Sequence, residues 1–176
     1  HGLTREASKS TQEKYLDPNL NPLFTFAVPG FNMRSTELNA VLGLEQLPKL
    51  DHNIKIRQKN FKLWLEHLNS DIYFIDYDVE GNSNFALPLI LNNPDKKVLK
   101  NVCNILEKEQ VEYRLGTIGG GNQARQPYMK KFTKRGTIRG PLYYSNYIHD
   151  NGLYVGNHTD LSKEQIINLC KKLNNV

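Results

Sequence analysis

Two short polar stretches contain the residue types that could bind or transform a ligand. In the first, Asn32 and Arg34 follow the Pro29-Gly30 break and stand just before an apolar-periodic run. A turn at the start of a helix can present an amide and a guanidinium to a ligand from a rigid base. We expect this turn to hold a ligand, although a local Asn turn or a structural salt bridge would explain the same residues.

The second stretch is glycine-rich and runs from Gly116 to Met129. Gly116 and Gly119 to Gly121 allow a ligand to approach the backbone, whose amides can form an anion-binding nest. Three amides and a guanidinium follow in one short loop: Asn122, Gln123, Arg125 and Gln126. The spacing fits neither a P-loop nor the dinucleotide fingerprint. A flexible turn is the alternative, but the polar sequel favours recognition of hydroxyls and phosphates.

The elements around the first stretch are a strand and two helices. Residues 1–22 are polar and predict a loop, and the alternating segment 23–28 predicts a short strand or an extended segment. A helix capped by Ser35 or Thr36 should follow, with its apolar face on Leu38, Val41, Leu42 and Leu44. Pro48 should kink or split this helix, and a longer amphipathic helix should continue to Leu68.

The rest of the chain alternates between strands and helices. We expect strands at 72–75, 84–91, 111–115 and 153–155, and helices at 96–108 and 141–148. A last helix should begin at a capping box formed by Ser162 and Gln165. This order predicts a compact α+β domain around the glycine-rich loop.

Composition narrows the class of protein. The chain has 176 residues, of which 39% are hydrophobic and 23% are charged, so one ordinary core is expected. It contains no run long enough to span a bilayer and no secretory leader, which favours a soluble, cytoplasmic protein. The formal charge of +5 is most simply a lysine-rich surface, although a polyanionic partner would also fit.

Cysteine and histidine usage predicts no redox or metal chemistry. Cys103 and Cys170 each fall within an expected helix and should be buried free thiols. His52, His67 and the other histidines have no ligand partners at metal-binding spacing, so we expect no metal site. Because the chain begins at His1 in mid-pattern, we expect it to be part of a longer protein.

Three stretches resemble one enzyme family. The segment GFNMRSTELNAVLGLEQLPKLD closely resembles the G-[YF]-N-x-R signature of the DegT/DnrJ/StrS-type sugar aminotransferases. HGLTRE is similar to the short segment that follows the family's cofactor-bearing strand, and GTIGGGNQARQPYM looks like its G-N-x-x-R-Q-P-Y block. The resemblance implies fold type I, an α/β architecture, with this chain as the C-terminal portion and its α+β small domain.

The resemblance also implies roles for individual residues. Asn32 would reach across a homodimer interface to the phosphate of the partner's pyridoxal phosphate (PLP), with Arg34 beside it. Gly121, Asn122, Arg125 and Gln126 would face a nucleotide-linked keto sugar, with Arg125 as the main phosphate contact. Residues 1–48 would end the large cofactor domain, 49–70 would be a linking helix, and 71–176 would form the small domain.

The family's catalytic lysine falls outside this chain, so the chain alone should contain no catalytic residue and should be inactive. The leading expectation is an aminotransferase of surface-polysaccharide or deoxyaminosugar biosynthesis, with glutamate as amino donor and no nucleic-acid or membrane partner. Replacement of the family's lysine by histidine would instead indicate a nucleotide-sugar 3-dehydratase. A non-catalytic module that binds nucleotide or nucleic acid is the alternative from another class.

Overall fold

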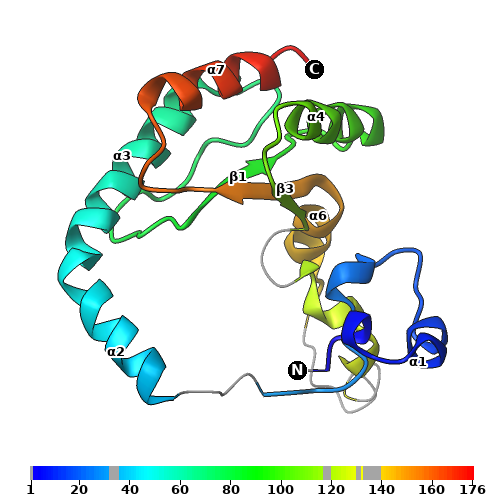
Figure 1. Ribbon diagram of the computed structural model, residues 1–176. Helices are drawn as coiled ribbons and strands as arrows, with labels where there is room; N and C mark the ends of the chain where they lie inside the picture. Colours follow the sequence, from blue (N-terminus) through cyan, green and yellow to red (C-terminus); the bar gives the residue numbers. More distant parts are fainter. Residues whose placement is uncertain (1, 32–35, 117–119, 130–131, 133–139) are drawn as a thin grey trace. The chain divides into compact units, whose positions relative to one another are not determined.

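The computed structural model describes residues 2–31, 36–116, 120–129, 132 and 140–176 (Figure 1). The chain divides into two compact units, His1–Met33 with Arg114–Leu153, and Arg34–Tyr113 with Tyr154–Val176. Residues 114–153 thus group with the start of the chain, although the sequence places them in the small domain. Hydrogen bonds between the Gln126 side chain and the backbone of Phe24 and Phe26 contribute to this grouping. The expected domain boundaries stay a prediction.

The second unit is built on helices packed against a small sheet. Helices α3 (Leu50–His67) and α7 (Lys163–Leu173) pack side by side, and α4 (Lys96–Lys108) also contacts α7. The sheet has the order β1 (Ala86–Ile90), β3 (Gly152–Gly156), β2 (Tyr113–Leu115). The Trp64 indole is fully buried and donates to the Pro88 carbonyl at 3.0 Å, which fixes α3 to β1.

Local caps explain why two of these helices begin where the sequence predicts. The Asp95 carboxylate accepts hydrogen bonds from the backbone of Lys97 and Val98, so α4 starts at Lys96 as expected. Ser162 and Gln165 form the predicted capping box of α7. The thiol of Cys170 is buried as predicted, whereas Cys103 is only half-buried, and both cysteines are free.

The N-terminal part of the second unit contains the expected helix pair. Helix α2 (Glu37–Gln46) is capped by Thr36 and is separated from α3 by a 3-10 turn, Leu47–Lys49, which confirms the break at Pro48. The apolar residues of α2 are not buried within this chain. The exposed ones are Leu38, Val41, Leu42 and Leu44.

Two predictions for the start of the chain were wrong. The expected loop contains a 3-10 turn (Thr4–Glu6) and helix α1 (Lys9–Lys14). The segment 23–28, expected as a short strand or an extended segment, begins instead as a 3-10 turn (Pro22–Phe24) and is extended from Thr25. The turn forms because the Asn21 side chain accepts from Leu23 N and Pro22 suits a first helical turn. The segment then pairs with the N-terminal stretch through a single antiparallel bridge, Leu3 with Phe26.

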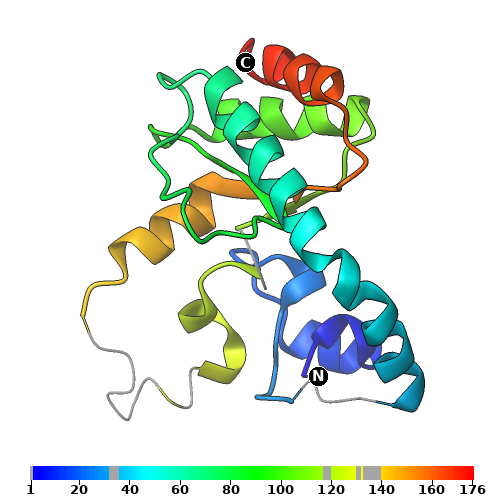
Figure 2. The same ribbon diagram turned by 90° about the vertical axis from the view of Figure 1, so that its left-hand side faces the viewer.

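Other elements exist but differ in extent. The strand expected at 72–75 is reduced to one bridge between Tyr73 and Leu91. The expected helix 141–148 is α6 (Tyr143–Asn151), which runs directly into β3 at Gly152 (Figure 2). Its bounds matter because several α6 side chains contact the glycine-rich loop.

Candidate functional site

Glycines form the bend of the loop because the backbone and its neighbours leave no room for side chains. Gly120 and Gly121 have φ of +88° and +79°, in the left-handed region. A Cβ on Gly120 would lie 2.7 Å from Cβ of Phe24, and one on Gly121 would lie 2.3 Å from Nδ1 of His149. The glycines therefore allow tight packing of the loop against two other segments.

Asn122 fixes the conformation of the loop that follows. Its side chain is 8% exposed and caps the 3-10 turn Gln123–Arg125, accepting from Ala124 N at 2.9 Å. Its Nδ2 donates to Oδ1 of Asn146 on α6 at 2.8 Å. The Asn122 side chain thus bonds both the turn Gln123–Arg125 and α6, which holds this turn against the helix.

Arg125 forms a two-pronged ion pair with helix α6. Its Nη1 and Nη2 donate to the two carboxylate oxygens of Asp150 at 2.6 and 2.8 Å, and its Nε donates to Asn146 at 2.9 Å. The hydrogen bonds to Asp150 raise the pKa of the guanidinium further above its ordinary value. One N–H on each terminal nitrogen remains after these bonds are counted, so the guanidinium can still donate to a ligand.

Gln126 is fully buried, and its amide pairs with the backbone of another segment. Oε1 accepts from Phe26 N at 2.9 Å, and Nε2 donates to the Phe24 carbonyl at 3.0 Å. The Gln126 side chain therefore pairs with the backbone N–H of Phe26 and the carbonyl of Phe24, as the backbone of a neighbouring strand would. Its direct contact with substrate stays a prediction, and the geometry gives it a positioning role.

His149 completes the site and was not among the residues predicted from the sequence. Its Nδ1 accepts from Asn122 N at 3.0 Å, and its Nε2 lies 3.2 Å from the Asn19 carbonyl. Because Nδ1 must accept, the ring is the neutral tautomer with a proton on Nε2, which donates to Asn19. A lone histidine gave no sequence signal, since both of its partners come from other parts of the chain.

Beside this network lies a hollow of about 360 Å³. Gly121 and Asn122 line it, whereas Arg125 and Gln126 do not. The remaining lining residues are Gly116, Gln123, Ala124, Ser145 and Ile148. The structure thus brings Gly121, Asn122, Arg125 and Gln126 into one region but orients them differently. Asn32 and Arg34, the predicted cofactor contacts, lie outside the described residues.

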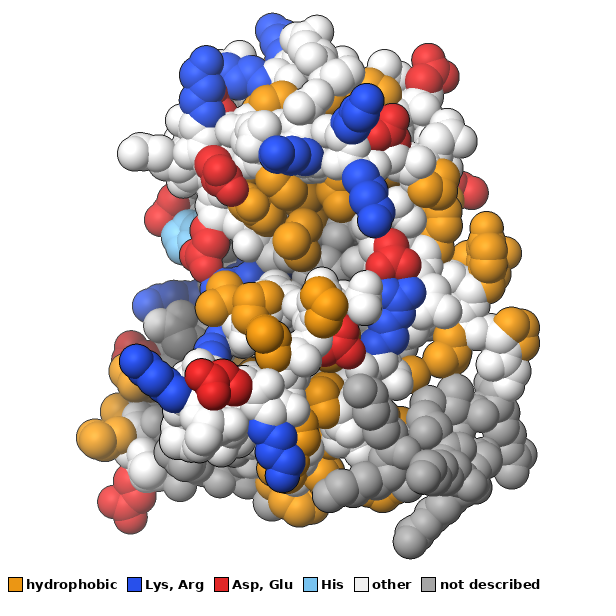
Figure 3. Space-filling view, turned by 90° about the vertical axis from the view of Figure 1, so that its right-hand side faces the viewer, with side chains coloured by type: hydrophobic (Ala, Val, Ile, Leu, Met, Phe, Trp, Pro, Cys, Tyr) orange, Lys and Arg blue, Asp and Glu red, His pale blue; other side chains and the backbone are white. Residues whose placement is uncertain are grey.

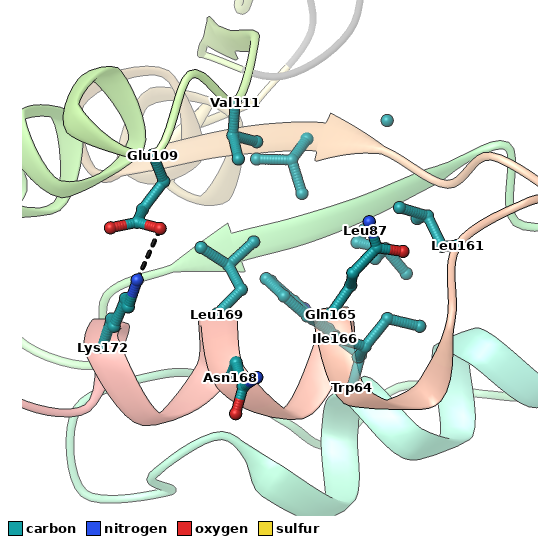
Figure 4. A pocket seen from close by; sticks show the side chains of 12 residues that line it. Trp64, Leu87, Glu109, Val111, Leu161, Gln165, Ile166, Asn168, Leu169 and Lys172 are labelled. Atoms are coloured by element: carbon teal, nitrogen blue, oxygen red, sulfur yellow. Dashed lines mark hydrogen bonds and ion pairs between the residues drawn. The ribbon is translucent and has the colours of Figure 1, made fainter.

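A second hollow, of about 380 Å³, lies in the other unit between α7 and the sheet (Figure 4). Its walls are mainly apolar side chains, among them Leu87, Ile166 and Leu169. An ion pair of 2.5 Å between Lys172 and Glu109 stands at one end of it. No predicted site residue lines this hollow.

The described part of the chain contains neither a metal-binding cluster nor a membrane-spanning helix. Among these residues no group of three or more His, Cys, Asp or Glu side chains could hold a metal ion. Within the same ranges, no helix has the length and apolar character needed to cross a bilayer.

Comparison with curated proteins finds relatives over nearly the whole chain. The chain is 34% identical over 173 residues to the GDP-4-keto-6-deoxy-D-mannose 3-dehydratase of Yersinia pseudotuberculosis, covering 96% of this chain and 43% of the relative. It is 29% identical over 161 residues to the enzyme of the same name from Escherichia coli O55:H7, covering 90% and 41%. The chain therefore spans less than half the length of these relatives.

A solved structure shares the fold. The crystal structure of a GDP-4-keto-6-deoxymannose-3-dehydratase with a trapped PLP-glutamate geminal diamine superposes with a TM-score of 0.63 at 25% identity, over 98% of this chain and 45% of that one. This similarity confirms the predicted fold class, the fold of the PLP-dependent fold type I enzymes. The 3-dehydratase names among the relatives favour the alternative prediction over the leading aminotransferase expectation.

The model of one protein family matches residues 1–174, far more than half of the sequence. That match extends from the HGLTRE segment through the glycine-rich loop to the end of α7. The chain belongs to the DegT/DnrJ/EryC1/StrS aminotransferase family.

Proposed function

We propose that the protein of which this chain is part is a PLP-dependent 3-dehydratase of a nucleotide-activated 4-keto sugar. The observation that carries the proposal is the identity of 34% over 96% of this chain with a curated 3-dehydratase. This chain supplies the C-terminal part of the enzyme, and the residue that holds the cofactor lies outside it. When bound, PLP supplies the electron sink for chemistry at the sugar, and the protein supplies orientation.

The residues of this chain would bind and orient the nucleotide sugar. Gly121 and Asn122 line the hollow of about 360 Å³, where part of the nucleotide sugar would bind. The remaining N–H groups of Arg125 suit a phosphate oxygen, and Asp150 and Asn146 hold the guanidinium in place. The described residues of this chain are proposed to bind and orient the substrate, and no chemical step is assigned to them.

The overall reaction balances with glutamate as the second substrate. The C3–O bond of the sugar breaks and a C3–H bond takes its place, while the 4-keto group is retained. The oxygen lost from the sugar balances the one that glutamate gains as it becomes 2-oxoglutarate and ammonia. Glutamate therefore supplies the two electrons, in keeping with the PLP-glutamate adduct in the similar solved structure.

We also propose a homodimer with shared sites. Helix α2 exposes Leu38, Val41, Leu42 and Leu44, and an apolar surface of this kind supports burial against another surface. By the family resemblance, Asn32 and Arg34 would then reach the cofactor phosphate of the partner subunit. Sedimentation of the full-length protein at nanomolar concentration tests this, and a fully active monomer would contradict it.

The nucleic-acid alternative receives no support from the described residues on the face shown in Figure 3. On the face shown in Figure 3, Lys and Arg side chains are interspersed with Asp and Glu, and no basic stripe is visible. A nucleic-acid interface would need clustered positive charge. Residues 117–119, 130, 131 and 133–139 of the region on which this alternative rests lie outside the described residues, so the alternative stays a prediction.

The test is a product analysis with the full-length protein. Purified enzyme with PLP and glutamate is incubated with GDP-4-keto-6-deoxymannose, and the sugar product is identified by mass spectrometry. A product lacking one oxygen and 2-oxoglutarate in equal amount support the 3-dehydratase. A product in which an amino group replaces the keto oxygen would establish the aminotransferase instead. The residue at the cofactor position, histidine or lysine, should agree with the product.

A further inference from the structure

We propose that the first turn of α6 carries a stacking surface for the nucleobase of a nucleoside diphosphate, formed by the ring of Tyr143. The inference rests on the proposed function, because it names the part of the nucleotide sugar that this surface would recognise. It adds a contact beyond the glycine-rich loop.

Helical geometry places Tyr143 on the face of α6 that holds Arg125. Asn146, Tyr147 and Asp150 lie three, four and seven residues after Tyr143, so all four side chains share one stripe. Two of them, Asn146 and Asp150, bind the Arg125 guanidinium. The stripe thus has an aromatic end and an end at which Asn146 and Asp150 hold the Arg125 guanidinium.

The separation of these ends fits a nucleotide. Seven residues of α-helix span about 10 Å, so the ring of Tyr143 lies that far along α6 from the carboxylate that holds Arg125. A ribose and a diphosphate bridge a distance of this order. A base on Tyr143 would therefore place its phosphates near the guanidinium.

The ring of Tyr143 is exposed to solvent and contacts two other tyrosine rings. Tyr143 is 66% exposed, which leaves a ring face open to a ligand. Tyr144 packs edge-on against it, with centroids 5.3 Å apart and planes at 82°, and Tyr147 lies 6.3 Å away with a tilt of 33°. Aromatic neighbours of this kind restrict the ring, which lowers the entropy lost when a base stacks on it.

Titration calorimetry on the full-length protein tests the proposal with two probes, GDP and inorganic pyrophosphate. Tyr143→Ala removes the ring on which the base would stack, so it should weaken GDP binding at least about fivefold. Pyrophosphate affinity should not change, because that probe has no base. Tyr143→Phe keeps the ring and should bind GDP within about twofold of the parent protein.

Two results would overturn the inference. One is unchanged GDP affinity in Tyr143→Ala, and the other is an equal loss for GDP and pyrophosphate, which would indicate that Tyr143 only supports the fold. Leu16→Ala, which removes an exposed apolar side chain from another part of the same unit, serves as the control and should leave both affinities unchanged. Since binding is measured without turnover, a wrong product in the dehydratase assay would refute the proposed function and leave this result unaffected.

Discussion

Replacing the buried amide of Gln126 tests whether this side chain holds the loop or contacts the ligand. Gln126→Leu has a similar volume but removes the acceptor for Phe26 N and the donor to the Phe24 carbonyl. Each buried backbone group left unpaired costs about 1–3 kcal/mol, so the two together cost about 2–6 kcal/mol. Because both bonds are only part-buried, water can replace some of this loss, and we expect about 2–3 kcal/mol.

The measurement is hydrogen exchange in the full-length protein, followed at the amide of Phe26, together with the urea midpoint of unfolding. Gln126→Leu should speed exchange at Phe26 and lower the midpoint. Gln126→Glu keeps the acceptor for Phe26 N but places a carboxylate oxygen against the Phe24 carbonyl, so it should be destabilising too.

A matched control is Gln12→Leu. It removes an exposed hydrogen bond of 2.9 Å that the Gln12 side-chain amide donates to the Ala7 carbonyl. Water can replace this bond, so its cost should stay within about 0.5 kcal/mol. If the Gln126→Leu variant had the same exchange rate at the Phe26 amide and the same urea midpoint as this control, the positioning role would be refuted. A loss of substrate affinity with unchanged stability would then support the direct contact predicted from the sequence.

Three further changes test other parts of the molecule. Gly121→Ala should destabilise the protein by more than about 2 kcal/mol in urea unfolding, because its Cβ would lie 2.3 Å from His149. Gly81→Ala is the control: Gly81 also has a positive φ but has free space around it, so the change should cost only about 1–2 kcal/mol. His149→Ala should raise KM for the nucleotide sugar more than it lowers kcat, since the ring holds Asn122 and not the reacting atoms; a change confined to kcat would contradict this. Burial raises the pKa of the Cys170 thiol from 9.0 to about 12, so this residue should resist a thiol reagent at pH 8 and its contribution to stability should fall as the pH rises from about 9 to 12. Rapid labelling of Cys170 in the folded protein would show that the helix packing is wrong.

The sequence predicted the elements whose signals are local. Helix α4 begins at Lys96 because the Asp95 carboxylate caps it, and the Ser162 box fixes the start of α7 in the same way. Pro48 separates α2 from α3 because it removes a backbone donor and clashes with the preceding turn. Each of these decisions depends on residues within one helical turn, so a single sequence contains the information.

The sequence failed where the deciding partner is distant along the chain. The segment 23–28 alternates as a strand does, but its partners are the N-terminal stretch and the side chain of Gln126, 100 residues away. His149 binds the carbonyl of Asn19, separated from it by 130 residues. Neither pairing has a signature in residue type or spacing, so neither was predicted.

The structure changes which residues of the glycine-rich loop carry functional weight. The glycines first favoured a ligand nest, yet Gly120 and Gly121 are already required by contacts with Phe24 and His149. Their presence is therefore explained by packing and is not evidence for a ligand. Side chains that keep donors after their packing contacts are counted are a better guide, and Arg125 is such a residue, because Asp150 and Asn146 orient it without using all of its N–H groups. A rigid loop with one fixed guanidinium loses little entropy on binding, which is the condition for positioning a substrate at a cofactor held elsewhere in the enzyme.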